Sequence, residues 1–128
     1  WYGFDDAIYS ALRIIEILSK TELTTNEVFN SYPKHYSTPE INLKVPEEEK
    51  FRIIDGLKTS IDSSVYELID IDGIRLENKN SWGLVRASNT SPNLVLRFEG
   101  KTESDLLEIK NYFKEMLSKI EFDLQLDF

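Results

Sequence analysis

Apolar residues recur at helical spacing in four segments of the chain. In residues 4–19 they return every three or four positions, which predicts an amphipathic helix. Residues 24–31 predict a shorter helix, because a Thr and a Glu three positions apart have the spacing of a capping box. Residues 46–61 and 101–120 show the helical period again. We expect the third helix to begin at Pro46, with three Glu in its first turn.

Elsewhere the pattern changes to the alternation that is typical of strands with one buried face. It predicts strands at 41–45, 81–88 and 93–100. It also predicts a hairpin around Asp72-Gly73, a dipeptide that favours tight turns. The strand before Asp72 has the weakest pattern, so we expect an antiparallel sheet of four or five strands. Strands and helices in this order predict an α+β fold with helices on one face of the sheet.

Prolines interrupt the pattern between residues 33 and 39 and predict a linker. We therefore expect two parts, a helical segment over residues 1–33 and a complete domain over residues 34–128. The two predicted helices before the linker, residues 4–19 and 24–31, are expected to belong to a neighbouring domain. His35 lies in the linker, and we interpret it as a solvated residue because no partner motif stands beside it.

Composition and charge narrow the function classes. The 128 residues include no Cys, which excludes disulfides and thiolate metal sites or catalysis. With 23 acidic and 15 basic residues the net charge is −8, which disfavours binding to nucleic acid. No apolar stretch is long enough to cross a membrane. Cytoplasm is the expected location.

The stretch 86–92 carries the densest set of hydrogen-bonding side chains, between two predicted strands. Arg86 has a planar fork that can grip two oxygens of one phosphate. Ser88 and Thr90 add hydroxyl groups, and Asn89 adds an amide. A turn also aligns backbone N–H groups toward an anion, and no carboxylate stands in the stretch to repel one. The alternatives are a phosphate-binding loop and a polar turn whose side chains satisfy their own backbone.

Three acidic groupings are open to a metal-binding interpretation: Asp5-Asp6, the Glu run 47–49, and the pair Asp70 and Asp72. Helix capping, a favourable helix dipole and turn chemistry explain them without a metal. We therefore predict no metal site in this chain.

Residues near the loop are interpreted as structural. Trp82 and Leu84 share one face of a strand and are predicted to lie in the core. Arg97 and Glu99 are predicted to lie on a solvated face. Arg75, with Lys79, is expected to add positive potential near the loop.

These segments resemble the α-D-phosphohexomutase family. Residues 83–92 followed by 94–99 are similar to the phosphate-binding loop of that family's last domain. Residues 72–75 fit its DG-[VI]-R-[VL] hairpin, and residues 37–41 fit its [ST]-TPE-[IL] entry into the last domain. Residues 2–6 look like the segment that opens the last long helix of its third domain. The resemblance spans essentially the whole chain, and its motifs occur in the family's order.

The pattern Arg-x-Ser-Asn-Thr most resembles the bacterial phosphomannomutase/phosphoglucomutase branch, since phosphoglucosamine mutases usually have Gly at the position of Asn89. The resemblance implies that residues 1–33 end the third, sugar-binding domain. It implies that residues 34–128 form the C-terminal phosphate-binding domain, with a TATA-binding-protein-like sheet. The chain is then expected to be a C-terminal fragment.

The resemblance also implies an activity for the parent protein. Such enzymes interconvert hexose 6-phosphate and hexose 1-phosphate of mannose or glucose through a bisphosphorylated sugar, assisted by Mg2+. Residues 86–91 would hold the phosphate that is not reacting. The phosphoserine motif and the metal loop are absent from this sequence. We therefore expect no catalytic residue, no metal ligand and no bound cofactor here, and an inactive fragment. Its expected partners are hexose phosphates and the other domains of the parent.

Three alternatives stay open: the phosphoglucosamine mutase branch, a nucleic-acid-binding module on a related fold, and a docking module. Fold alone does not choose among them. The net charge of −8 and the absence of a basic stripe oppose the nucleic-acid module.

Overall fold

The computed structural model describes residues 3, 5–120, 124 and 126–128. The chain divides into two compact units, Trp1–Lys34 and His35–Phe128.

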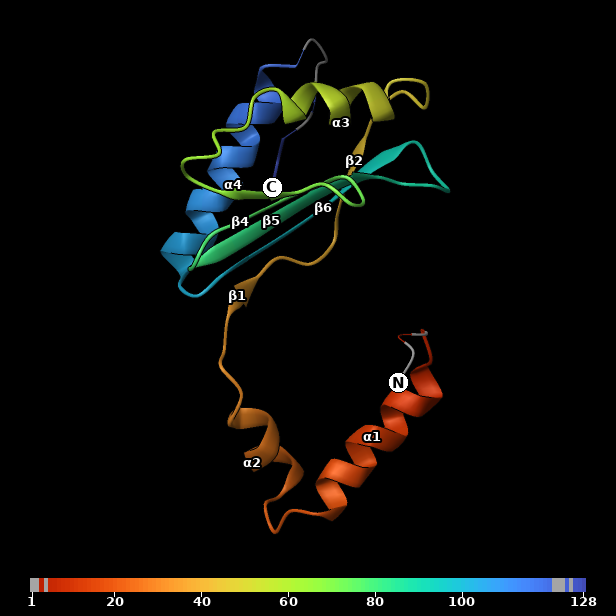
Figure 1. Ribbon diagram of the computed structural model, residues 1–128, viewed down its shortest axis with the longest axis vertical. Helices are drawn as coiled ribbons and strands as arrows, with labels where there is room; N and C mark the ends of the chain where they lie inside the picture. Colours follow the sequence, from red (N-terminus) through yellow and green to blue (C-terminus); the bar gives the residue numbers. More distant parts are fainter. Residues whose placement is uncertain (1–2, 4, 121–123, 125) are drawn as a thin grey trace. The chain divides into compact units, whose positions relative to one another are not determined.

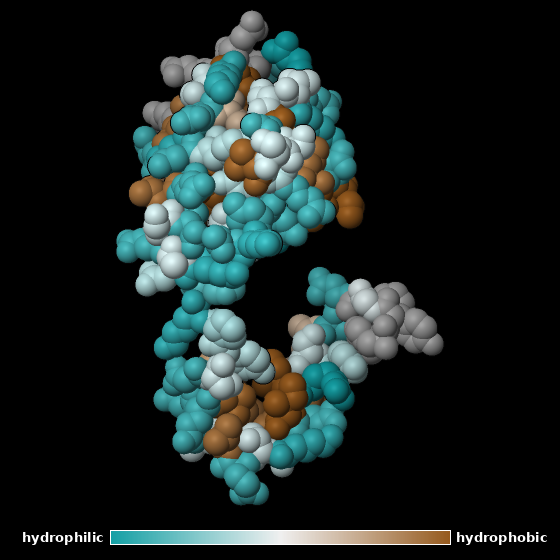
Figure 2. Space-filling view, turned by 60° about the vertical axis from the view of Figure 1, so that its left-hand side comes forward, coloured by the Kyte–Doolittle hydropathy of each residue, from teal (hydrophilic) through white to brown (hydrophobic). Residues whose placement is uncertain are grey.

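The first unit contains two helices, as the periodicity predicts (Figure 1). Helix α1 spans Ala7–Ser19, and the side chain of Asp6 caps it by accepting from a first-turn backbone N–H. Helix α2 spans Thr25–Asn30, and Thr24 and Glu27 form the predicted capping box. No described residue of either helix is buried. Figure 2 shows apolar surface gathered on this unit, and the exposed large hydrophobic side chains among its described residues are Ile8, Leu12, Ile14, Ile15, Ile17, Leu23, Phe29 and Tyr32.

The second unit is an antiparallel sheet covered on one face by two helices (Figure 1). The strand order is β1-β6-β5-β4-β3, and β2 also pairs with β6. This architecture confirms the predicted α+β class. Its elements are β1 Tyr36–Ser37, β2 Ile41–Lys44, α3 Lys50–Lys58, β3 Glu67–Ile69, β4 Ile74–Glu77, β5 Ser81–Ala87, β6 Asn93–Gly100 and α4 Glu103–Ser118.

Strand β1 is a sixth strand that the pattern does not predict, because it lies inside the expected linker. Ser37 pairs with Glu99 of β6. Beyond it, the backbone N–H of Thr38 donates to the carbonyl of Phe98 at 3.0 Å, and the N–H of Phe98 donates to Oγ1 of Thr38 at 3.1 Å. The ordered sheet therefore begins earlier in the chain than the prolines suggest.

The core lies between the sheet and helices α3 and α4. Gly83 allows α4 to approach closely, because a Cβ at this position would lie 2.5 Å from the ring of Phe113. Burying each large apolar side chain contributes roughly 1.5–3 kcal/mol. The fully buried side chains are Ile53, Leu57, Ile74, Leu76, Val85, Leu94, Leu96, Phe98, Ile109, Phe113 and Leu117.

Helix α3 begins four residues later than predicted. Residues 46–49 form a turn, in which the N–H of Glu49 donates to the carbonyl of Pro46 at 3.0 Å. The three Glu therefore precede the helix instead of occupying its first turn. The buried face of α3 is formed by Lys50, Ile53, Ile54 and Leu57, whereas Phe51 is 58% exposed.

Trp82 and Leu84 do not belong to the core, which corrects the sequence prediction. On β5 the buried positions are Ser81, Gly83, Val85 and Ala87. Trp82, Leu84 and Arg86 alternate with them and are only partly buried. The face is decided by α4, which requires the small residue Gly83 beneath it. The guanidinium of Arg75 instead covers the Trp82 ring, 4.1 Å from its centroid.

The described residues of the C-terminal tail pack against the second unit. Leu124, Leu126 and Phe128 are partly buried against the core, and Phe128 stacks on Phe98 with ring centroids 5.5 Å apart. Residues 121–123 and 125 lie outside the described residues.

Candidate functional site

The predicted loop joins the end of β5 to the start of β6. The backbone N–H of Ser88 donates to the carbonyl of Asn93 at 2.9 Å and closes the base of the loop. Above this base, Ser88 is buried, whereas the side chains of Asn89 and Thr90 are exposed. The loop therefore presents Asn89 and Thr90 to solvent on a base that the sheet holds in place.

Hydroxyl groups bond one another inside the loop. The Oγ of Ser88 accepts from the Oγ of Ser91 at 2.9 Å and from the backbone N–H of Thr90 at 3.3 Å. The side-chain amide of Asn93 donates to the Oγ of Ser91 at 3.1 Å. Because the Ser88 oxygen accepts twice, its own proton can be donated to a ligand. The side chains of Asn89 and Thr90 make no hydrogen bond within the described part of the chain.

Arg86 is the penultimate residue of β5, beside the loop and on the face of the sheet away from the helices. Its side chain is 35% exposed, and its Nη1 lies 3.7 Å from the Oδ2 of Asp72. This separation is too long for a hydrogen bond, so the pair is a loose electrostatic contact. The fork of Arg86 is therefore available to a ligand.

The β3–β4 hairpin lies directly against this arginine. Gly73 has a φ of +85°, and a Cβ built on it would lie 2.6 Å from the Cβ of Arg86. The predicted turn at Asp72-Gly73 is thus confirmed. The hairpin brings the carboxylate of Asp72 near Arg86, whereas the loop itself, residues 86–92, contains no carboxylate.

Lys50 is a residue of this region that the sequence interpretation missed. Its Nζ donates to the carbonyl of Ser88 at 2.7 Å and lies 2.5 Å from the Oε1 of Glu47, while its side chain is only 3% exposed. A signal was present, because Lys50 precedes Ile53, Ile54 and Leu57 with the spacing of a buried helix face. A charged residue at a core position of this kind needs a partner.

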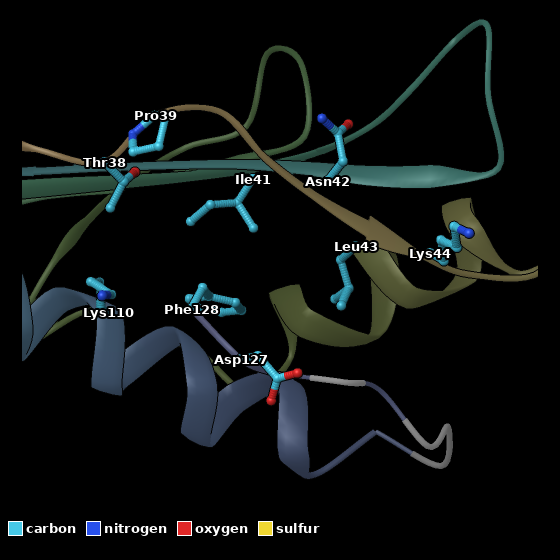
Figure 3. A pocket seen from close by; sticks show the side chains of 9 residues that line it. All are labelled: Thr38, Pro39, Ile41, Asn42, Leu43, Lys44, Lys110, Asp127 and Phe128. Atoms are coloured by element: carbon cyan, nitrogen blue, oxygen red, sulfur yellow. The ribbon is translucent and has the colours of Figure 1, made fainter.

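The large cavity of the second unit lies elsewhere, between β2, α4 and the tail. Its volume is about 930 Å3. In Figure 3, Ile41 and Leu43 project from β2 toward Phe128 and α4, whereas Asn42 projects away from them. The cavity contains none of the four predicted phosphate ligands. The cavity is lined by Thr38, Pro39, Ile41, Asn42, Leu43, Lys44, Lys110, Asp127 and Phe128. The candidate phosphate site is therefore a surface loop outside this cavity.

The structure brings Arg86, Ser88, Asn89 and Thr90 together in one loop and its adjoining strand end. Lys79 is not near them, because it lies in the β4–β5 connection at the other end of β5. The expectation that Lys79 supports the loop is therefore wrong.

Arg75 is the other cation that was expected to support the loop. Its guanidinium instead contacts one side chain of its own strand, β4, and one of the next strand, β5. It bonds the Oε2 of Glu77 at 2.8 Å and stacks on Trp82.

The two remaining side-chain predictions are partly corrected. His35 is not a free linker residue, since its Nδ1 lies 2.7 Å from the Oε1 of Glu99. Glu99 is consequently half-buried, whereas Arg97 is exposed as predicted.

The metal-binding interpretations find no support in the structure. Among residues 3, 5–120, 124 and 126–128, no three His, Cys, Asp or Glu side chains group as metal ligands do.

In the same residues, no helix combines the length and apolar character that a membrane span needs.

The family described as "Phosphoglucomutase/phosphomannomutase, C-terminal domain" matches residues 40–116, which include the loop, α3 and most of the sheet. The chain belongs to this family. The resemblance noted from its motifs is thereby confirmed.

Relatives of the family are similar over nearly the whole chain. A phosphomannomutase/phosphoglucomutase of Pseudomonas putida is 52% identical over 128 residues, and a phosphoglucomutase of Neisseria meningitidis is 43% identical over 119 residues. These alignments cover 100% and 91% of this chain, but only 28% and 26% of the relatives. A probable phosphoglucosamine mutase of Methanococcoides burtonii is 30% identical over 115 residues, 88% of this chain and 26% of the relative.

A solved structure supports the fold. A phosphoglucomutase/phosphomannomutase family protein of Burkholderia thailandensis superposes with a TM-score of 0.78 at 35% sequence identity. The match covers 97% of this chain and 26% of that protein. The chain therefore spans about a quarter of the length of the proteins that it resembles.

Proposed function

We propose that this chain is the phosphate-binding C-terminal part of a phosphomannomutase/phosphoglucomutase. The parent would interconvert hexose 6-phosphate and hexose 1-phosphate through a bisphosphorylated sugar. Residues 86–91 would hold the phosphate that is not reacting. The observation that carries the proposal is the loop itself, in which the Arg86 fork, held only loosely by Asp72 of the neighbouring hairpin, stands beside the exposed side chains of Asn89 and Thr90, and no carboxylate lies within residues 86–92.

The donors suit a phosphate better than a sugar. A phosphate oxygen only accepts, and the groups free to reach it are N–H and O–H donors of Arg86, Ser88, Asn89 and Thr90. A sugar hydroxyl needs acceptors as well. We therefore propose that the loop recognises the phosphate of either sugar ester and leaves the choice of mannose or glucose to other parts of the parent.

Holding a remote phosphate contributes to catalysis through position. Binding energy gained at the non-reacting end fixes the reacting end and can be expressed in the transition state. The loop residues of this chain thus orient substrate without touching the transferred group. We expect the 128-residue chain alone to bind phosphate weakly and to be inactive as a mutase.

Mg2+ belongs to the proposed parent and not to this loop. Among the described residues, no three His, Cys, Asp or Glu side chains group as metal ligands do, which supports placing the ion in other parts of the parent. Other parts of the parent would hold it, and cytoplasm is its proposed location.

We favour the phosphomannomutase/phosphoglucomutase branch over the phosphoglucosamine mutase branch. The support is Asn89 in the loop and the 52% identity to the Pseudomonas putida relative, against 30% to the probable phosphoglucosamine mutase.

An NMR titration of the 128-residue chain tests the proposal. Glucose 1-phosphate and glucose 6-phosphate should each shift the amides of residues 86–91, with a dissociation constant on the order of millimolar, or about 4 kcal/mol. Arg86→Ala should abolish the shifts, because hydrogen bonds to charged groups are worth about 1.5–3 kcal/mol each. Arg86→Lys should restore them only partly, since a lysine lacks the two-pronged grip.

Arg97→Ala is the matched control. Arg97 is an exposed arginine on the neighbouring strand and the same face of the sheet, but it is not part of the loop. Its loss should leave the affinity nearly unchanged. Shifts centred outside the loop, or shifts that survive Arg86→Ala undiminished, would refute the assignment.

A further inference from the structure

Lys50 is a buried cation that the proposed phosphate contacts do not use. It is the first residue of α3, and its side chain is 3% exposed. Lysine is almost never fully buried unless it is paired, because an ammonium loses its hydration there. The free-energy cost of burying this ammonium therefore arises directly beneath the candidate loop.

Two of the three ammonium N–H donors are accounted for. One bonds the carbonyl of Ser88 at 2.7 Å, and another faces the Oε1 of Glu47 at 2.5 Å. Within residues 3, 5–120, 124 and 126–128 the structure shows no third hydrogen-bond acceptor for this ammonium, which also lies 5.4 Å from the centroid of the Phe51 ring. Glu47 is largely exposed, so its charge is screened by solvent more than that of the lysine.

The bond to Ser88 fixes the direction of a peptide group. In a trans peptide the carbonyl and the following N–H point in opposite directions, and the chain has no cis peptide bond among its described residues. Because Lys50 draws the Ser88 carbonyl toward the interior, the N–H of Asn89 must point outward, away from Lys50. That N–H makes no hydrogen bond within the described residues, so it is free to donate to an anion.

We propose that Lys50 is a positioning residue that presets the loop for phosphate. It locks the Ser88–Asn89 peptide with the Asn89 N–H outward, and it adds a positive charge beneath the loop. An anion then meets an oriented donor without first turning the peptide, which reduces the ordering cost of binding. This inference rests on the proposed function, because it assumes that phosphate binds at residues 86–91.

A purely structural lysine would behave differently. Its removal would lower the free energy of unfolding and leave the phosphate affinity of the folded protein unchanged. A positioning lysine also alters the affinity and the environment of the Asn89 amide. The two roles are therefore separable in folded protein well below its thermal midpoint.

The test is an NMR titration of the 128-residue chain with inorganic phosphate. Lys50→Met keeps the length of the side chain without the charge, and it should weaken binding by about tenfold or more, as expected for a lost charged hydrogen bond. In the absence of phosphate it should also shift the Asn89 amide. Glu47→Gln is the matched control, because it removes the partner but keeps the ammonium, and its affinity should not fall.

The outcomes separate the inference from the proposed function. Absence of any loop shift in the unmodified chain overturns both. Loop binding that is equally tight in folded Lys50→Met overturns the role of Lys50 alone. If Lys50→Met does not fold, Lys50→Gln replaces it; a several-fold loss of affinity supports the proposal, and unchanged affinity overturns it.

Discussion

Gly73 lies so close to Arg86 that a Cβ on the glycine would be 2.6 Å from the Cβ of the arginine. The same position has a φ of +85°, which side chains rarely tolerate. The β3–β4 hairpin therefore rests directly on the strand end that carries the candidate phosphate fork. Two constraints coincide there, one of space and one of backbone conformation.

Gly73→Ala should consequently destabilise the second unit and displace Arg86. A residue forced into this conformation costs about 1–3 kcal/mol, and the contact with Arg86 adds to it. Urea unfolding should show the loss, and phosphate titration should show weaker binding. Gly56→Ala is the control, because Gly56 lies in α3 with nothing within 4 Å of the added Cβ. It should be neutral or stabilising by about 0.5–1 kcal/mol, and an equal loss at both sites would contradict the argument.

Asp72→Asn should strengthen phosphate binding. Asp72 is the carboxylate 3.7 Å from Arg86, so it competes with an anion for the same fork. The pair is solvated, and its removal should be worth only about 0.2–1 kcal/mol, or up to a few-fold in affinity. Asp70→Asn is the control of equal charge, since Asp70 faces Lys58 instead. An equal gain in both variants at low salt would indicate net charge and not competition.

Hydrogen exchange should distinguish α1 from α4. Helix α1 has no buried residue, whereas α4 buries Ile109, Phe113, Met116 and Leu117. Amides of α1 should therefore exchange through local opening and those of α4 only through unfolding of the second unit. Equal protection of both helices would show that α1 is stabilised by contacts beyond those of its own unit.

The stability of the second unit should fall at high pH because of Tyr66. Burial, with smaller contributions from Glu108 and Tyr112, raises the pKa of this phenol above its usual value despite a hydrogen bond with Ser81. The neutral form is favoured in the folded state. Its stabilising effect is complete below about pH 10, the unfolded value, and is lost as the pH rises through the folded pKa.

Urea unfolding at pH 9 and pH 11 measures this effect. Tyr66→Phe cannot ionise, so the variant should lose less of its unfolding free energy between the two conditions. An identical loss in both proteins would exclude Tyr66 as a cause.

Local signals in the sequence were sufficient for much of the fold. The capping box of Thr24 and Glu27 and the turn at Asp72-Gly73 depend on neighbouring residues only, and both form as predicted. The loop was also visible, because four donors between two alternating segments are a local pattern. Its ligand remains a prediction, since composition and geometry describe the donors and not what they bind.

The missed features depend on residues distant in the sequence. Strand β1 has two residues and no alternation, and only its pairing with β6 defines it. The partner of buried Lys50 is the carbonyl of Ser88, 38 positions away, so only the tertiary fold brings the two together. Trp82 and Leu84 could face either side of β5, and the contact of Gly83 with α4 decides the side.

The linker that joins the two units is short. The last bond that caps α2 ends at Ser31, and His35 is already held by Glu99 of the sheet. Only Tyr32, Pro33 and Lys34 lie between them, and three residues extend over about 10 Å at most. Such a tether can lengthen very little. Because the loop, Lys50 and the Gly73 hairpin all belong to the second unit, every group of the proposed phosphate site lies on the same side of this tether.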